Sequence, residues 1–150
     1  MPRPDMPPIG LELARTAKTV SRAFDAALAA AGGSTPVWLI LISLKTERRA
    51  NQRALAEAVG IQDATLTHHL NSMEADGLLT RRRDPSNRRV HNVELTERGE
   101  ALFERLRAAA TSFDRDLRAE IPDQDIEQLR GTLARLRTAV SQPSRLAPWS

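Results

Sequence analysis

The chain has 150 residues, a formal net charge of +3 at pH 7 and a sequence pI of about 10.4. This length suits one domain with a real core, or a small domain with an oligomerisation frame. It has no cysteine, which excludes disulfides, thiol redox switches and thiolate metal sites. The longest apolar run, Val37 to Leu44, is too short to span a bilayer, and the proline-rich start lacks the apolar core of a signal peptide. We therefore expect a cytoplasmic protein.

The first third of the chain predicts an arm and two helices. Residues 1–8 contain four prolines and are expected to form an extended or disordered arm. A helix is predicted over residues 9–31, ended by Gly32 and Gly33. Thr35 is the expected cap, and Pro36 the first residue, of a helix over about 36–45 that is apolar nearly all round and should be buried. The apolar stripe of the first helix comprises Leu13, Ala17, Val20, Phe24, Ala27 and Leu28.

Residues 51–77 predict two short helices joined by a turn. Asn51 can cap the first, which closes on Gly60. The second runs over about residues 62–75, with Gly77 just past its end. One face packs inward through Leu66, Leu70 and Met73, at i, i+4 and i+7. The opposite face carries short, mostly hydrogen-bonding side chains that can approach base edges without clashing: Asp63, Ala64, Thr67, His68 and Asn71.

Two strand-like segments follow, at residues 78–83 and 89–95. Between them lies the sequence DPSN, a strong turn signal in which Pro85 presets φ. Five arginines flank this tip, opposed only by Asp84: Arg81, Arg82, Arg83, Arg88 and Arg89. A helix-turn-helix followed by an arginine-tipped β-hairpin is a winged helix, whose chemistry is phosphate binding and groove reading.

The last third predicts two further helices. Thr96 caps a long helix that runs to about Glu120, with Glu97 in its first turn. Pro122 breaks this helix, and Asp123 opens the last one. Each carries an apolar stripe, made of Leu102, Leu106, Ala109, Phe113 and Leu117 on the long helix and of Ile126, Leu129, Leu133, Leu136 and Val140 on the last.

One small subunit is too small to cover the apolar stripes of all the terminal helices. We therefore predict a two-fold homodimer in which these helices intertwine. The fold class is mainly α with a small β-hairpin wing (α+β). The expected layout is an arm and dimerisation helix (1–33), a winged helix-turn-helix domain (34–99), and C-terminal dimerisation helices with a tail (100–150). Such a dimer places two recognition helices in successive major grooves, roughly 34–36 Å apart, on pseudo-palindromic double-stranded DNA.

Residues 55–99 resemble the winged helix of MarR-type bacterial transcriptional regulators. The resemblance lies in the T-x-T of Thr65 and Thr67, the L-x-x-M-E-x-D-G-L-L ending, the D-P-x-x-R-R wing and the V-x-L-T-x-x-G exit. Singly these motifs are weak, but in this order and spacing they are specific. The resemblance implies a DNA-binding regulator, and most simply a repressor that a small ligand releases.

The resemblance also implies which residues contact DNA. In the recognition helix, the residues expected to face the major groove are Gln62, Asp63, Ala64, Thr67, His68 and Asn71, with Thr65 on a phosphate. Of the two adjacent histidines, His68 is expected to point outward and His69 toward the helix flank or the dimer side. Gln62 is a poor cap, and Asp63 is expected to take over capping, which competes with its base contact.

In the wing, Arg89 matches the arginine that relatives insert into the minor groove, and Arg88 would then touch the backbone. Arg82 and Arg83 complete the expected wing contacts. Many relatives brace the inserted arginine with an acidic residue where this chain has Asn87, so Asp84 is the substitute brace. Arg48 and Arg49 in the preceding linker either lie near the DNA backbone or belong to a solvated loop.

Family members commonly bind small aromatic or phenolic acids between the dimer helices and the winged helix. Such a pocket needs a cationic side chain and an apolar wall. The residues at matching places are Arg15, Trp38, Phe103 and Arg107, although Trp38 is better explained as plain core. No cofactor and no metal is expected.

Three other functions compete with this prediction. An enzyme is not expected, because the chain has no Cys or Tyr and its histidines have no known catalytic spacing. A metal-responsive repressor would use His68, His69 and His91, whose spacing is not a known ligand set. A winged helix used only for protein interaction usually lacks a basic wing and a polar recognition face, and this chain has both.

Overall fold

The structure is a computed structural model that describes residues 6–46, 50–87 and 91–141. The chain divides into two compact units, residues 1–111 and 112–150, which are described separately below. The predictions for the arm (residues 1–5), for Arg48, Arg49, Arg88 and Arg89, and for the tail (residues 142–150) lie outside the described residues.

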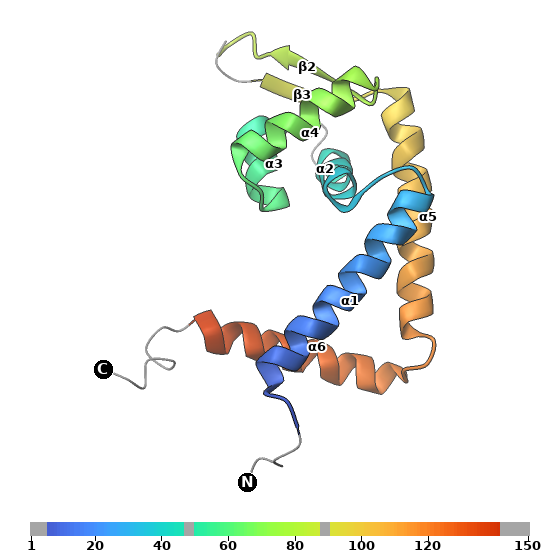
Figure 1. The fold of residues 1–150 in the computed structure, drawn as a ribbon. Coiled ribbons are helices and arrows are strands. Elements are labelled where there is room, and N and C mark those ends of the chain that lie inside the picture. The colour runs from blue at the N-terminus through green and yellow to red at the C-terminus, as the bar shows by residue number, and fades with distance from the viewer. Residues whose placement is uncertain (1–5, 47–49, 88–90, 142–150) are drawn as a thin grey trace, which may run out of the picture. The chain divides into compact units, whose positions relative to one another are not determined.

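The described residues form helices and short strands in the order that the sequence predicts, with one strand added (Figure 1). The elements are α1 (Ile9–Ala30), α2 (Thr35–Thr46), β1 (Ala50–Asn51), α3 (Gln52–Val59), α4 (Asp63–Ala75), β2 (Leu79–Arg83), β3 (His91–Leu95), α5 (Glu97–Arg118) and α6 (Asp123–Ser141). The mainly helical fold with a β-hairpin wing is therefore confirmed.

Both ends of α3 and the start of α5 follow the predicted capping chemistry. The side chain of Asn51 accepts a hydrogen bond from the Ala54 amide at 2.8 Å, and Gly60 ends α3 in the left-handed region at φ +72°. The Thr96 hydroxyl accepts the Gly99 amide at 3.1 Å, as expected of the α5 cap.

The expected cap of α2 was wrong by one residue. The helix already includes Thr35, and Ser34 is the residue whose Oγ accepts the Val37 amide, at 3.4 Å. The Thr35 hydroxyl instead donates to the carboxylate of Asp25 on α1. A serine directly before a threonine offers two capping hydroxyls, and the bond to α1 is tertiary, so local sequence could not choose between them.

The strands form one antiparallel sheet of order β1-β3-β2. Leu79 pairs with Leu95 and Arg83 with His91, which sets the register of the predicted hairpin. The extra strand β1 pairs Ala50 with Val93. It was missed because two residues in a polar linker carry no alternating pattern.

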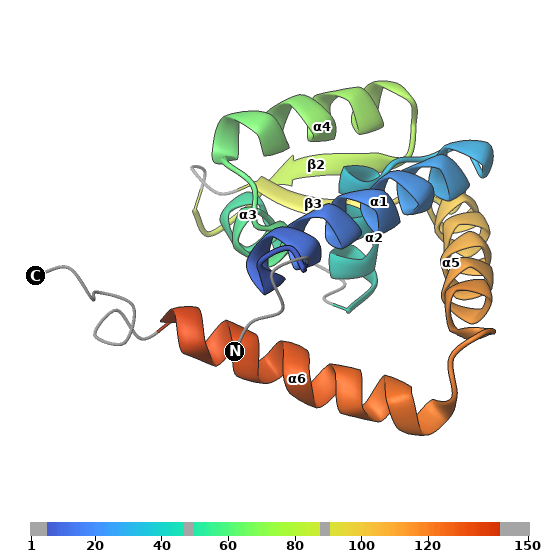
Figure 2. The same ribbon diagram turned by 60° about the horizontal axis from the view of Figure 1, so that its bottom comes forward.

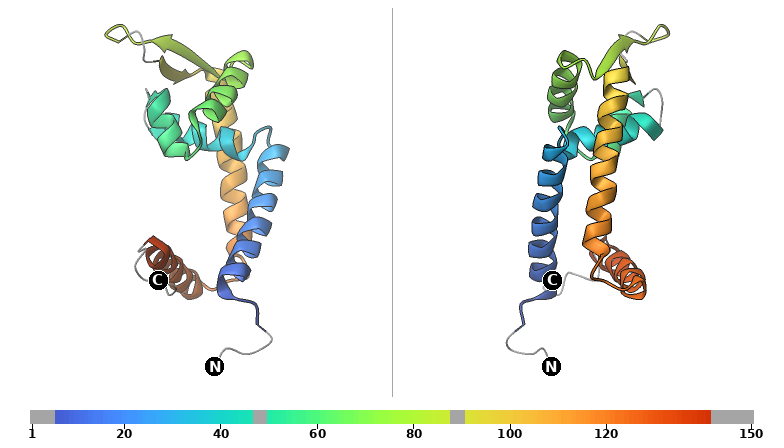
Figure 3. Two further views of the ribbon diagram at one scale, coloured as in Figure 1. Left: turned by 60° about the vertical axis from the view of Figure 1, so that its left-hand side comes forward. Right: turned by 90° about the vertical axis from the view of Figure 1, so that its right-hand side faces the viewer.

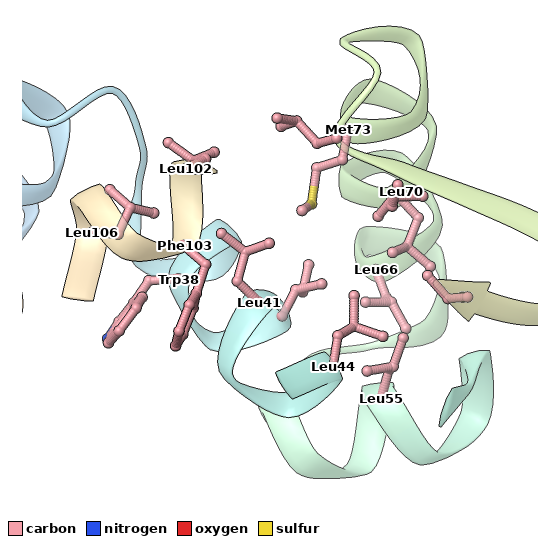
Figure 4. Packing of buried hydrophobic residues seen from close by; sticks show 14 of the residues in the cluster. Trp38, Leu41, Leu44, Leu55, Leu66, Leu70, Met73, Leu102, Phe103 and Leu106 are labelled. Carbon is pink, nitrogen blue, oxygen red and sulfur yellow. The ribbon is translucent and has the colours of Figure 1, made fainter. Parts of the chain in front are cut away.

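The core of the first unit is built from the end of α1, from α2, α3, α4 and the sheet, and from the start of α5 (Figure 4). Leu66 and Leu70 are fully buried and Met73 is 2% exposed, which confirms the inward face of α4. From α5, Leu102, Phe103 and Leu106 complete this core. The recognition helix is thus held against the body of the unit by its apolar side, with its polar side outward.

The apolar stripes of the other helices are only partly covered within each unit. Leu28 is the buried residue of α1, whereas Leu13 is 38% exposed. On α6, in the second unit, Ile126 is buried while Leu129 is 48% exposed and Val140 is 67% exposed. Among the described residues, no single helix is long and apolar enough to cross a membrane, and only the bent pair of α1 and α2 would pass by length and composition.

Candidate nucleic-acid interface

The outer face of α4 is polar and open. The exposed residues of this helix and its capping position include six of those predicted to contact DNA: Gln62, Asp63, Ala64, Thr65, His68 and Asn71. His69 is half-buried and His68 exposed, in agreement with the predicted orientation of the pair. The two rings lie 5.9 Å apart, edge to face. The helix therefore presents short hydrogen-bonding groups on the side opposite its buried leucines.

Thr67 differs from its neighbours, because it is only half-exposed. Its hydroxyl oxygen accepts a hydrogen bond from Nε2 of Gln52, at the start of α3, at 2.7 Å. This bond joins the first residue of α3 to the middle of α4. Gln52 was not predicted as part of the site, because only the fold brings it within reach of α4.

The start of α4 lies at the turn between the two helices. Gln62 occupies the capping position and makes no capping side-chain bond, as expected of a poor cap. The prediction that Asp63 takes over the cap was wrong, since Asp63 is the first helical residue. There its charge favours the positive end of the helix dipole. An open depression of about 410 Å³ lies beside this turn and is lined by Arg53, Ala56, Glu57, Gly60, Ile61, Gln62 and Asp63.

The wing strand β2 runs beneath α4 (Figure 2) and is joined to it by Arg81. Nη2 of Arg81 donates to Oε1 of Glu74 at 3.0 Å and also to Oδ1 of Asn71. The backbone amide of Arg81 donates to Oε2 of the same Glu74, at 3.0 Å. Because its side chain is only 19% exposed, Arg81 differs from Arg82 and Arg83, which are exposed on the same strand.

The hairpin projects away from α3 and α4 toward the turn at residues 84–87 (Figure 3). Asp84 organises this turn: its Oδ1 accepts the Ser86 amide at 2.8 Å and the Ser86 hydroxyl at 2.5 Å. Its Oδ2 accepts from Nδ2 of Asn92 at 3.3 Å. The hydrogen bond from the Ser86 side chain, with those from Asn92 and the turn amides, lowers the pKa of Asp84 below its ordinary value of 3.8. The same carboxylate is the predicted brace of Arg89, which lies outside the described residues.

The four residues proposed for a ligand pocket differ in exposure. Trp38 and Phe103 stack with ring centroids 5.5 Å apart and 18° between planes, and each is 9% exposed (Figure 4). Arg107 pairs with Glu104 at 2.8 Å on the exposed side of α5, and Arg15 is exposed on α1. The two rings therefore belong to the core, with the ammonium group of Lys45 5.3 Å above Phe103.

Among residues 6–46, 50–87 and 91–141, no group of three or more His, Asp or Glu side chains is placed to hold a metal ion.

Comparison with known proteins places this geometry in a known class. Residues 34–91 match the model of the MarR family. A solved structure of a probable transcriptional regulator from Pseudomonas aeruginosa is 29% identical, with a TM-score of 0.75 over 86% of this chain and 96% of that one. A MarR-family transcriptional regulator from Rhodococcus sp. RHA1 is 27% identical, with a TM-score of 0.73 over 85% of this chain and 91% of that one.

A third similar structure includes nucleic acid. The transcriptional repressor CouR, solved bound to a 23-mer DNA duplex, is 25% identical, with a TM-score of 0.75 over 90% of this chain and 93% of that one.

Proposed function

We propose that the chain belongs to the MarR family of transcriptional regulators, whose model its residues 34–91 match, and that it is a homodimeric repressor that binds a pseudo-palindromic operator and is released by a small ligand. It acts on double-stranded DNA in the cytoplasm. The recognition helix α4 reads the major groove, and the arginine-rich hairpin binds the neighbouring backbone and minor groove.

The observation that carries this proposal is the two-sided construction of α4. Leu66 and Leu70 are fully buried, so the helix has one orientation relative to the body of the first unit. The opposite side is exposed and polar, and the adjoining hairpin exposes Arg82 and Arg83. A firmly held polar helix beside exposed guanidinium groups suits base-edge reading combined with phosphate neutralisation.

The dimer is supported by the uncovered apolar residues of the terminal helices. Leu13 on α1, Leu117 on α5 and Leu129 on α6 are between 38% and 48% exposed. Each lies in a stripe at helical spacing, so the exposed residues are not isolated surface leucines. Burying the stripes against a second copy removes this apolar surface from water.

The proposed response to a ligand is supported by the kinds of side chain present, which are aromatic rings and guanidinium groups. The stacked rings of Trp38 and Phe103, each 9% exposed in the core, form an aromatic wall where α2 meets α5, and Arg107 lies one helical turn beyond Phe103. An aromatic acid would place its ring against this wall and its carboxylate on a guanidinium group, such as that of Arg15 or Arg107. Binding there would alter the packing of α2, on which the winged helix is built.

The test is DNA binding by the purified chain to fragments of its own upstream region and to random genomic DNA, at two salt concentrations. We expect tight binding that weakens steeply with salt and is reduced at least tenfold by Arg82→Ala and by Arg89→Ala. Arg22→Ala, which removes the same charge from the exposed side of α1, is the matched control and should bind like the parent. If no fragment binds even at low salt, the regulator proposal fails and a protein-interaction module replaces it.

A further inference from the structure

Arg81 is set apart from the other wing arginines by its partners. Its guanidinium group is held by Glu74 and turned toward the outer face of α4, where it donates to Oδ1 of Asn71. Since the Glu74 carboxylate also accepts the Arg81 backbone amide, at 3.0 Å, the strand and the helix are tied at two points. Arg81 therefore acts within the protein, on the recognition helix, while Arg82 remains exposed.

This contact decides how the Asn71 amide is turned. An arginine has only donors, so the atom of Asn71 that faces it must be the acceptor oxygen. The amide nitrogen Nδ2 then lies on the other side, with two N–H donors and no hydrogen-bond partner among the described residues. Asn71 is exposed and lies one helical turn after Thr67 on the polar side of α4.

We propose that Arg81 is a specificity-determining positioning residue, which holds Asn71 as a hydrogen-bond donor toward the major groove. This inference rests on the proposed DNA-binding function. Asparagine reads adenine by accepting from N6 and donating to N7, which needs the oxygen and the nitrogen to face the base together. With the oxygen engaged by Arg81, Asn71 instead recognises a base edge that offers only acceptors, namely guanine O6 and N7 or thymine O4.

Gln52 and Thr67 favour the same polarity one helical turn earlier. The Thr67 oxygen accepts from Gln52, so its hydroxyl proton is left to donate. The Thr67 hydroxyl and the Asn71 amide nitrogen are thus two hydrogen-bond donors one helical turn apart. They suit successive bases that present acceptor atoms along one strand of the operator.

The experiment is selection of binding sites from a random duplex pool by the full chain and its variants. Asn71→Ala first identifies the operator position that Asn71 reads, because discrimination is lost there. At that position we expect the parent protein to prefer guanine or thymine over adenine and cytosine by roughly tenfold. Arg81→Met should reduce this preference to less than about threefold, because the amide is then free to turn.

Asn71→Asp is the second variant, because it keeps an acceptor for Arg81 and so preserves the tie between strand and helix. Having no donor, it should shift the preferred base to cytosine, whose N4 amino group donates. Arg82→Met is the matched control. It should weaken binding to all sequences, lower the salt slope by about 0.9 and leave the base preference unchanged.

The outcomes separate this inference from the proposed function. Tight binding with adenine preferred at the Asn71 position, or a base preference that Arg81→Met and Asn71→Asp both leave unchanged, overturns the role of Arg81 and leaves the regulator standing. A parent protein that binds no duplex overturns the regulator, and this inference with it.

Discussion

Gly99, in the first turn of α5, lies directly against the backbone carbonyl of Leu78: a β-carbon placed on Gly99 would fall 2.0 Å from that oxygen. The Thr96 hydroxyl strengthens the same junction by donating to the carbonyl of Gly77, at 2.6 Å. The chain leaving the wing is thus packed backbone to backbone against the chain that enters it. The close contact explains on steric grounds why the V-x-L-T-x-x-G sequence has a glycine at its last position.

Gly99→Ala should therefore destabilise the protein. The new methyl group meets backbone, which moves only if α5 shifts relative to β2, and overpacking of this kind costs about 1–3 kcal/mol or more. Urea unfolding followed by circular dichroism measures the loss of stability.

Gly131→Ala is the matched control, since nothing lies within 4 Å of its added carbon in α6. There alanine should stabilise by roughly 0.5–1 kcal/mol. Equal effects of the two substitutions would disprove the close contact at Gly99.

Leu66→Ala should reduce stability by about 2–5 kcal/mol, because Leu66 is fully buried beneath the recognition helix and the change leaves a cavity. The neighbouring Thr65→Ala, on the exposed side, should alter stability by less than about 0.5 kcal/mol while weakening DNA binding through a lost phosphate contact. Thermal melts and DNA titrations of both variants measure the contrast. An early melt of Thr65→Ala would mean that the two faces of α4 are wrongly assigned.

Asn51→Ala should cost about 1 kcal/mol of stability, because the Ala54 amide loses the side-chain acceptor that caps α3. Asn51→Asp retains an acceptor oxygen and adds a charge suited to the positive end of the helix, so it should be close to neutral. Denaturant midpoints of the three proteins are the measurement. A loss in Asn51→Asp as large as in Asn51→Ala would point away from capping and toward the amide nitrogen.

The Asp84 carboxyl should titrate below pH 3.8, because hydrogen bonds from Ser86 and Asn92 favour its charged form in the folded wing. A pKa lowered by folding adds stability above the unfolded value, and this stability is lost as the pH falls through the folded value. The wing should therefore loosen only in acid, and between about pH 5 and pH 8 Asp84 should contribute no pH dependence. Carbon-detected NMR of the carboxyl group gives the value directly. Ser86→Ala, which removes the largest cause, should move the pKa of Asp84 back toward 3.8, and an unchanged pKa would contradict this assignment.

Sequence reasoning succeeded where the determinants of structure are local. Asn51, Gly60 and Thr96 act on amides and dihedral angles within a few residues, so their capping roles could be predicted. The inward face of α4 followed in the same way from helical spacing.

The parts of the site that sequence could not predict depend on tertiary contacts. In the sequence, Arg81 is indistinguishable from the other wing arginines. Only the pairing of β2 with β3, and the packing of β2 beneath α4, show that Arg81 faces Glu74. Gln52 and Thr67 are fifteen residues apart and meet through the turn of the two helices. Trp38 stacks on Phe103, which lies on a helix more than sixty residues further along the chain. In each case the partner is distant in sequence, and no local pattern marks it.

The last prediction concerns the dimer. Leu129→Glu places a charge in the apolar stripe of α6 at a residue that is 48% exposed within its own unit, so the unit itself should tolerate it. In a homodimer the charge would be buried twice without a partner, which strongly disfavours association. Sedimentation equilibrium should then show a monomer where the parent is a dimer.

The DNA affinity of the Leu129→Glu protein should fall by more than tenfold, because two half-sites are no longer bound by one linked pair of recognition helices. Gln128→Glu, one residue away on the exposed polar side, adds the same charge and should leave both properties unchanged. A Leu129→Glu protein that remains dimeric would exclude this face of α6 from the interface.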